Sequence, residues 1–163
     1  MPRIVVFLTA SLSALFVLWL GSQMPEMVAS HFSVSGNSDS HLPRSSFVPL
    51  FAVLCAALPT FVWWLQVHAV TRGKMKIPNA QYWFAPPEND RTQRFLVRHA
   101  AWFSSLLAAF LCYVFWLVFQ ANSSDVASKA LNTQAFFIGL LAFLVLTAVW
   151  LYALHARFGR KDA

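Results

Sequence analysis

AFFIGLLAFLVLTAVWLYAL, the stretch from Ala135 to Leu154, decides the fold class of this chain. It contains 20 residues and no charged side chain, and a helix that rises about 1.5 Å per residue needs roughly 20 residues to cross the hydrocarbon core of a bilayer. Three other apolar runs of similar length occur, at Ile4–Leu20, Phe47–Val67 and Ala100–Phe119. The pattern predicts four transmembrane helices and therefore an all-α, polytopic membrane protein.

The composition of the whole chain leads to the same class. Of its 163 residues, 58% are hydrophobic and 11% are charged, which is too apolar for an ordinary soluble domain. The formal net charge of +6 would suggest nucleic-acid binding in a soluble chain. Here the basic residues flank apolar spans, where they set topology and contact lipid phosphates. We expect one small membrane domain over residues 1–163 that contacts the lipid bilayer and no nucleic acid.

The basic residues are distributed unevenly between the two sides of the four spans. Ten lie on the side of the termini and of connection 68–99, whereas only Arg44 and Lys129 lie on the other side. Each side also carries three acidic residues, so the net charges are +7 and −1. Because cytoplasmic segments retain positive charge during insertion, both termini are predicted to be cytoplasmic and loop 21–46 to be outside. The ten are Arg3, Arg72, Lys74, Lys76, Arg91, Arg94, Arg98, Arg157, Arg160 and Lys161.

The first two spans have features that bear on packing. The apolar stretch of the first is longer than the roughly 7 to 15 residues of a signal peptide, so we expect it to be retained as an anchor. In the second, Pro49 and Pro59 are expected to bend the helix, and a neighbouring helix is expected to satisfy the carbonyl that Pro59 leaves free. Trp63 and Trp64 then approach the cytoplasmic boundary, where indoles typically anchor a helix in the interface.

Connection 68–99 contains an aromatic run and a helical pattern. Prolines bracket Tyr82-Trp83-Phe84, whose rings are expected at the depth of the lipid headgroups. Asp90 followed by Gln93 resembles a capping box and predicts an amphipathic helical segment continuous with the third span. The basic and aromatic residues of this segment, at helical spacing, are Arg91, Arg94, Phe95, Arg98 and Trp102. Its arginines are candidates to bind anionic lipid or an acidic partner, and snorkelling to the interface is the simpler explanation.

Two short stretches resemble a known family. PEMVASHFSVSGNSD, from Pro25 to Asp39, has a proline, an extended run that ends in His-Phe, and a glycine turn; IPNAQYWFAPPE begins at Ile77 in the cytoplasmic connection. Both resemble the bacterial membrane domain-of-unknown-function family 1648, the N-terminal unit of SdpI-like membrane proteins. The matching residues are Pro25, His31, Phe32 and Gly36 in the outer loop and Pro78, Asn79, Tyr82, Trp83 and Pro86 inside. The resemblance implies a multi-pass protein of the bacterial inner (cytoplasmic) membrane, in a group of which some members act in toxin immunity and signalling.

The outer loop is also informative without the resemblance. Gly36 next to Asn37 suits a turn that needs a positive φ, so we expect the loop to be ordered against the outer helix ends. His31, Asp39 and His41 are candidate ligands for zinc or copper. Their spacing matches no closed metal motif, and hydrogen-bonded or pH-sensitive surface histidines are the favoured interpretation.

Three further histidines lie near the cytoplasmic ends of the second, third and fourth spans: His68, His99 and His155. If they converge, they are candidates to hold a metal or to relay protons. Interfacial placement beside neighbouring arginines is the favoured alternative. Cys55 and Cys112 lie at similar depths in their spans and are candidates to face one another, although buried small side chains are the simpler reading.

The spans contain no aspartate or glutamate and no evident nucleophile with its base. Membrane proteases and proton-coupled transporters usually place carboxylates inside the bilayer, so enzyme and autonomous-transporter functions are disfavoured. No cofactor is expected. We expect a non-catalytic sensing, immunity or accessory subunit that binds another membrane protein, a second copy of itself or a lipid through its two loops. The alternatives are a metal-dependent membrane enzyme that uses a histidine cluster and a transporter subunit.

Overall fold

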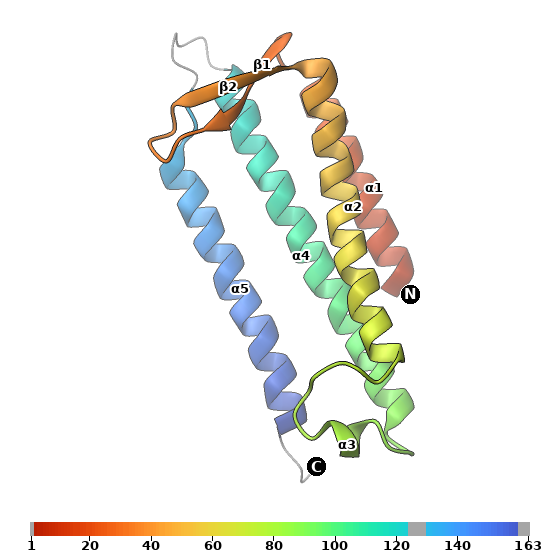
Figure 1. Cartoon of the computed structure of the whole chain (residues 1–163). Coiled ribbons are helices and arrows are strands. Elements are labelled where there is room, and N and C mark those ends of the chain that lie inside the picture. The colour runs from red at the N-terminus through yellow and green to blue at the C-terminus, as the bar shows by residue number, and fades with distance from the viewer. Residues whose placement is uncertain (1, 124–129, 160–163) are drawn as a thin grey trace.

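The structure, a computed structural model, describes residues 2–123 and 130–159 and is built on four long helices (Figure 1). These helices, each long and apolar enough to cross a membrane, are α1 (Pro2–Gly21), α2 (Arg44–Thr71), α4 (Asn89–Ser123) and α5 (Thr133–Gly159). The prediction of an all-α polytopic protein with four spans is confirmed. The smaller elements are the antiparallel strands β1 (Met27–Phe32) and β2 (Ser38–Pro43) and the short helix α3 (Ala80–Trp83).

The two ends of the bundle carry different elements. The hairpin of β1 and β2 lies at one end, and α3 lies at the other end together with the N-terminal end of α1 and the C-terminal end of α5 (Figure 1). We call these the hairpin end and the α3 end. The shared placement of the two termini follows from the even number of spans, and the charge count predicts that the α3 end is cytoplasmic.

All four helices extend beyond the predicted apolar runs. The largest extension is in α4, whose 35 residues correspond to about 52 Å of helix against a hydrocarbon core of about 30 Å. Its first turns contain the predicted amphipathic segment, which is continuous with the span and buries Thr92 and Leu96. The predicted capping box of Asp90 and Gln93 is not formed, because α4 begins at Asn89 and the Gln93 side chain donates to the Asn89 side chain instead (3.0 Å). Connection 68–99 is therefore largely helical, and only residues 72–88 join α2 to α4.

The helices do not form a symmetric bundle. α1, α2 and α4 each contact the other two, whereas α5 packs chiefly along α4. Phe158 is the one buried residue of α5 in the described part of the chain. Close approach of α5 depends on Gly139, because the ring of Tyr113 occupies the space where any Cβ would lie. The Tyr113 hydroxyl also donates to the carbonyl of Ala135 (2.7 Å).

The hairpin shares the hydrophobic core of the bundle. Buried side chains of α1, α2 and α4 form one cluster with residues of the outer loop: Val17, Leu20, Met24, Val28, Phe47, Val48, Ala52, Cys55, Phe115 and Val118. Met24 and Val28 are 1% and 0% exposed, so the segment between α1 and α2 is packed into the core rather than lying over it. Burial of this apolar surface is what gives a short hairpin its fixed position.

The second span differs in detail from its prediction. α2 continues through both prolines. The Ser104 hydroxyl of α4 donates to the carbonyl of Pro59 itself (2.9 Å), which is not the carbonyl of Cys55 that Pro59 leaves without a helical donor. The prediction that Trp63 is an interfacial anchor is wrong, because its indole is 6% exposed and packs against Val6 and Ala100. Trp64 is half-exposed, and its interfacial position remains a prediction.

Candidate functional site

The hairpin of β1 and β2 is the most distinctive feature outside the helices. β1 pairs with β2 from Met27 opposite Pro43 to Phe32 opposite Ser38, with irregular pairing around His31. The turn closes through hydrogen bonds between Ser33 and the Gly36–Asn37 segment, each 2.9 Å. Gly36 has a φ of 88°, as its position in the sequence predicted.

The tip of the hairpin is bonded to the segment that precedes α5. The Leu131 amide donates to the Gly36 carbonyl (2.8 Å), and Asn37 forms an isolated β-bridge with Ala130. A Cβ on Gly36 would lie 2.5 Å from the Leu131 carbonyl oxygen. Gly36 is thus required both by its backbone angle and by the close approach of another segment.

The base of the hairpin is held by Asn122, near the end of α4. Its side chain is 4% exposed and accepts from the Ala29 amide (2.7 Å) while donating to the Ala29 carbonyl (3.1 Å). It donates also to the carbonyl of Val118 one turn earlier (2.9 Å). The amide group therefore pairs with β1 in the way that a neighbouring strand would. Asn122 is not apparent as a functional residue from the sequence, where its signal is a polar residue at the end of an apolar run.

Arg44 ties the start of β1 to the start of α2. Its guanidinium donates to the carbonyls of Ser22 (3.1 Å) and Met24 (2.6 Å), and its amide donates to the carbonyl of Glu26 (2.8 Å). The carbonyls just after the C-terminus of α1 have no helical partner of their own, which makes them natural acceptors for a cation. This arginine, treated above only as a topology signal, therefore has a structural role.

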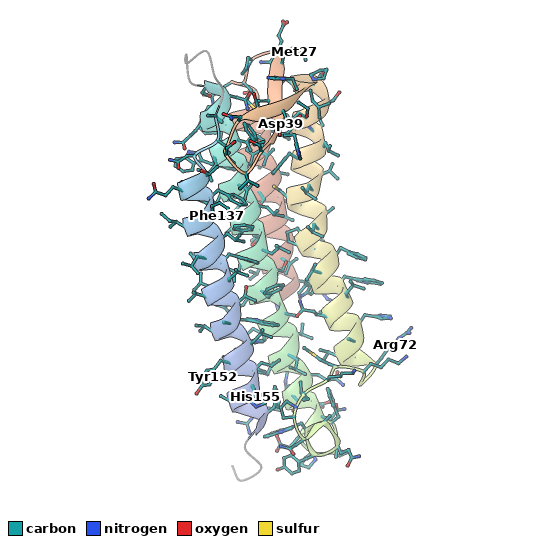
Figure 2. The ribbon with its side chains drawn as sticks, turned by 60° about the vertical axis from the view of Figure 1, so that its left-hand side comes forward. Met27, Asp39, Arg72, Phe137, Tyr152 and His155 are labelled. Atoms are coloured by element: carbon teal, nitrogen blue, oxygen red, sulfur yellow. The ribbon has the colours of Figure 1, made fainter. Side chains whose placement is uncertain are left out.

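The residues of the outer family motif have different environments. Phe32 packs against the core cluster, whereas His31, the residue before it in β1, is exposed. Pro25 is exposed in the segment that leads into β1. Five of the six β2 residues are exposed, and the sheet has two strands only, so the outer edge of β2 has no strand partner among the described residues. Figure 2 shows Met27 and Asp39 at this end of the molecule.

The candidate metal ligands of the hairpin are exposed and do not form a cluster. His31, Asp39 and His41 all lie on the surface of the hairpin. Among residues 2–123 and 130–159, no group of three or more His, Cys, Asp or Glu side chains lies close enough to hold a metal ion. A metal-dependent enzyme therefore has no assembled ligand set in this part of the chain.

The histidines of the α3 end have separate environments. His68 stacks on Trp64 with ring centroids 5.2 Å apart, and His155 is exposed on α5 (Figure 2). His99 stacks on Trp150 at 4.5 Å. Its Nε2 lies 3.1 Å from the Trp150 carbonyl, and the Trp150 indole donates to the His99 carbonyl (3.0 Å). His99 thus joins α4 to α5.

Segment 79–83 at the α3 end caps the C-terminal end of α5. Asn79, at a φ of 53°, donates from its side chain to the Phe158 carbonyl (3.1 Å), and the Trp83 indole donates to the same oxygen (3.2 Å). The Trp83 ring packs edge-on against Phe158, which is 0% exposed. Carbonyls of the last helical turn lack helical partners, so these two donors satisfy one of them.

The aromatic run is consequently divided between core and surface. Trp83 and Phe84 pack against a buried cluster that contains Ile77 and Phe158, which differs from the expectation that all three rings lie among the headgroups. Tyr82 is 49% exposed. Of the two motif prolines, Pro78 is half-buried and Pro86 is exposed.

The two cysteines of the spans lie together. The thiols of Cys55 and Cys112 are close enough to interact, and the Ser13 hydroxyl of α1 lies beside Cys112. Both cysteines are free. The proposed facing arrangement is therefore present, in a contact that joins α1, α2 and α4.

Within residues 2–123 and 130–159 the structure thus shows an ordered hairpin with an unpaired strand edge at one end and a cluster of arginines at the α3 end, and no group of side chains assembled to hold a metal ion. Membership of family 1648 remains a prediction from the two motifs. Comparison of the chain with known protein families, curated proteins and solved structures gives no match.

Proposed function

We propose that this protein is a non-catalytic subunit of the bacterial cytoplasmic membrane that recognises another protein through its outer hairpin, in a sensing, immunity or accessory role. The observation that carries this proposal is the attachment of β1 to α4 by Asn122, which is buried and bonded to both backbone groups of Ala29. A loop with no role beyond connecting two helices needs no such attachment. A surface that binds a partner gains affinity when it is ordered in advance.

The exposed strand supports a particular mode of recognition. β2 presents an edge without a strand partner in the described chain and side chains that are mostly exposed, among them His41 and Leu42. An extended segment of a partner can add to such an edge, with backbone hydrogen bonds for affinity and side-chain contacts for specificity. Attachment of β1 to the bundle leaves β2 as the edge available for this addition.

The family resemblance supports the same role. Two residues of the outer motif contribute to the order of the hairpin: Phe32 packs against the core cluster, and Gly36 provides the positive φ of the turn. We propose on this basis that the chain belongs to family 1648 and that its hairpin lies outside the cytoplasm, where a secreted or membrane-anchored partner is accessible. The net charges of −1 and +7 on the two sides support this orientation.

A site-specific photocrosslinker tests the proposal. Placed at Leu42 in cells, it is expected to capture a discrete protein, whereas the same group at Tyr152, 73% exposed on the outer side of α5 (Figure 2), is expected to capture lipid. The captured protein must also co-purify with the unmodified chain in mild detergent at a fixed ratio. Replacement of Asn122 by leucine is expected to abolish both signals. Lipid alone at both positions, with no co-purifying protein, would reject the proposal.

A further inference from the structure

A groove at the α3 end is lined by four arginines. It has a volume of about 790 Å³ and lies over the first turns of α4, between the N-terminal end of α1 and the C-terminal end of α5. The residues that define it are Arg91, Arg94 and Arg98 of α4, Pro2 of α1, and Phe95 and Arg157 at the contact between α4 and α5.

The arginines of this groove are not neutralised by the protein. In residues 2–123 and 130–159, the guanidinium groups of Arg91, Arg94 and Arg98 have no hydrogen bond or ion pair, and the Asp90 carboxylate, one turn before Arg94, makes none with it. Arg157 is placed by the Phe95 ring, with its guanidinium carbon 4.1 Å from the ring centroid. A cation over an aromatic face keeps its charge and its hydrogen-bond donors. The groove therefore gathers four positive charges and no compensating anion from the described chain.

An apolar groove continues from the arginines toward the middle of the membrane. It has a volume of about 290 Å³, shares Pro2 and Arg98 with the first groove, and runs between α1 and α4 past Val5, Ala101, Trp102 and Ser105. Trp102 is 70% exposed although it lies beside this groove. Arg91, Arg94, Arg98, Trp102 and Ser105 follow the spacing of a single helix face. One face of α4 thus changes from cationic to apolar along its length.

We propose that the two grooves together bind one anionic phospholipid. Its phosphate lies among the guanidiniums of Arg94, Arg98 and Arg157, and one acyl chain lies along the apolar groove beside Trp102. Guanidinium groups bind phosphate oxygens through paired, charge-assisted hydrogen bonds. From Arg98 to Ser105 the helix rises about 10 Å, which is enough to cover the first half of an acyl chain.

The combination of the two grooves selects this ligand over others of the same charge. A soluble phosphate ester or an acidic peptide would account for the arginines but leaves the adjoining apolar groove without a role. Snorkelling arginines account for exposed guanidiniums near a membrane, but they do not require Arg157 of α5 to converge with those of α4. A single molecule with a charged head and an apolar tail matches both grooves and their order along α4.

Binding by the purified full-length protein in a neutral detergent tests the proposal. Native mass spectrometry with dioleoylphosphatidylglycerol, dioleoylphosphatidylcholine and glycerol 1-phosphate separates headgroup charge from the acyl chains. We expect one molecule of the phosphatidylglycerol to be retained and little of the other two. Equal retention of the two lipids would show that the headgroup charge is not recognised. Tight binding of glycerol 1-phosphate would show that the acyl chains are not needed. Either result would overturn the proposal.

Matched variants locate the site. Arg94→Gln with Arg98→Gln is expected to weaken binding of the phosphatidylglycerol by about 25-fold, from about fivefold for each arginine. The control, Arg72→Gln with Lys74→Gln, removes the same charge from exposed residues at the end of α2 and is expected to change binding less than about twofold. An equal loss in both pairs would mean general surface attraction and would overturn the site.

The acyl-chain groove has a separate variant. Trp102→Ala leaves every arginine in place and is expected to weaken phosphatidylglycerol binding several-fold, because the indole area beside the chain is lost. Its binding of glycerol 1-phosphate is expected to stay at the level of the unmodified protein. Since Trp102 and the arginines are exposed, thermal unfolding of each variant should match that of the unmodified protein. Unchanged lipid binding in a folded Trp102→Ala variant would reject the acyl-chain half of the proposal.

Discussion

The hairpin end and the α3 end of this protein use their arginines in opposite ways. At the hairpin end the guanidinium of Arg44 donates hydrogen bonds to the carbonyls of Ser22 and Met24. At the α3 end the guanidinium groups of Arg91, Arg94 and Arg98 have no hydrogen-bond or ion-pair partner in the described chain, and the C-terminal end of α5 is held by Asn79 and Trp83. The difference separates two functions of positive charge. One end uses it to order the backbone, and the other leaves it available to an anion.

The first prediction concerns the orientation of the protein, with the hairpin end outside and the α3 end in the cytoplasm. Val34 is 85% exposed in the hairpin turn, and Gln81 is exposed on α3. In intact cells a membrane-impermeant maleimide is expected to label the Val34→Cys variant fully and Gln81→Cys only after permeabilisation. The unmodified protein, whose cysteines lie in the spans, serves as the blank. Labelling of Gln81→Cys alone in intact cells would invert the predicted topology.

Removal of Asn122 is expected to have the largest effect on stability. In Asn122→Leu the amide and carbonyl of Ala29 lose their partner while buried, which should cost about 3 kcal/mol of unfolding free energy. Denaturation by sodium dodecyl sulfate in mixed micelles measures the change. Gln120→Leu is the control, because Gln120 is exposed two residues earlier and is expected to shift the midpoint little. Similar shifts for the two variants would mean that the hairpin is not held through Asn122.

Gly36 and Gly73 allow the two ends to be compared directly. Both have a positive φ, of 88° and 62°, but a Cβ on Gly36 meets the Leu131 carbonyl whereas a Cβ on Gly73 meets nothing within 4 Å. Alanine at Gly73 is expected to cost about 1 kcal/mol for the backbone angle alone. Alanine at Gly36 should cost about 2 kcal/mol, since the hairpin tip must also move from the segment before α5. If the two variants lose equal unfolding free energy in the same mixed-micelle denaturation, the contact between Gly36 and Leu131 can relax at little cost.

The cap on α5 is expected to give the smallest effect. Asn79→Gly keeps the positive φ accessible and removes one bond to the Phe158 carbonyl, for a loss of about 1 kcal/mol. Hydrogen exchange at residues 150–159 should become faster while exchange in the hairpin stays the same. Tyr82→Phe, which removes a hydroxyl from an exposed ring of the same segment, is the control. Faster exchange at both ends would show that the ends are coupled rather than independent.

Features set by local chemistry could be predicted from the sequence. The four spans follow from apolar runs, the extension of α4 follows from the helical spacing of its arginines, and the turn follows from Gly36. In each case the residues that determine the structure are neighbours in the chain. A periodic pattern or a required backbone angle is then sufficient.

Features that depend on distant residues could not be predicted. Asn122 meets Ala29 across 93 positions, and Asn79 and Trp83 meet Phe158 across 79 and 75. Trp63 and Trp64 are adjacent, yet only the first turns into the bundle. Composition and spacing carry no information on which face of a helix meets its neighbour when nearly every face is apolar.

Three properties follow from the amino-acid sequence alone: a multi-pass membrane protein, four spanning helices, and unequal charge at the two ends. In hydrocarbon each backbone polar group must be satisfied within the protein, so a long apolar run forms a helix. Which polar side chains have partners is known only from the folded structure, because it depends on how each helix is rotated and where its ends meet other segments. Arg44 and Arg98 have the same side chain, but their neighbours differ. Arg44 holds the backbone after α1 through hydrogen bonds, whereas Arg98 lines an open groove.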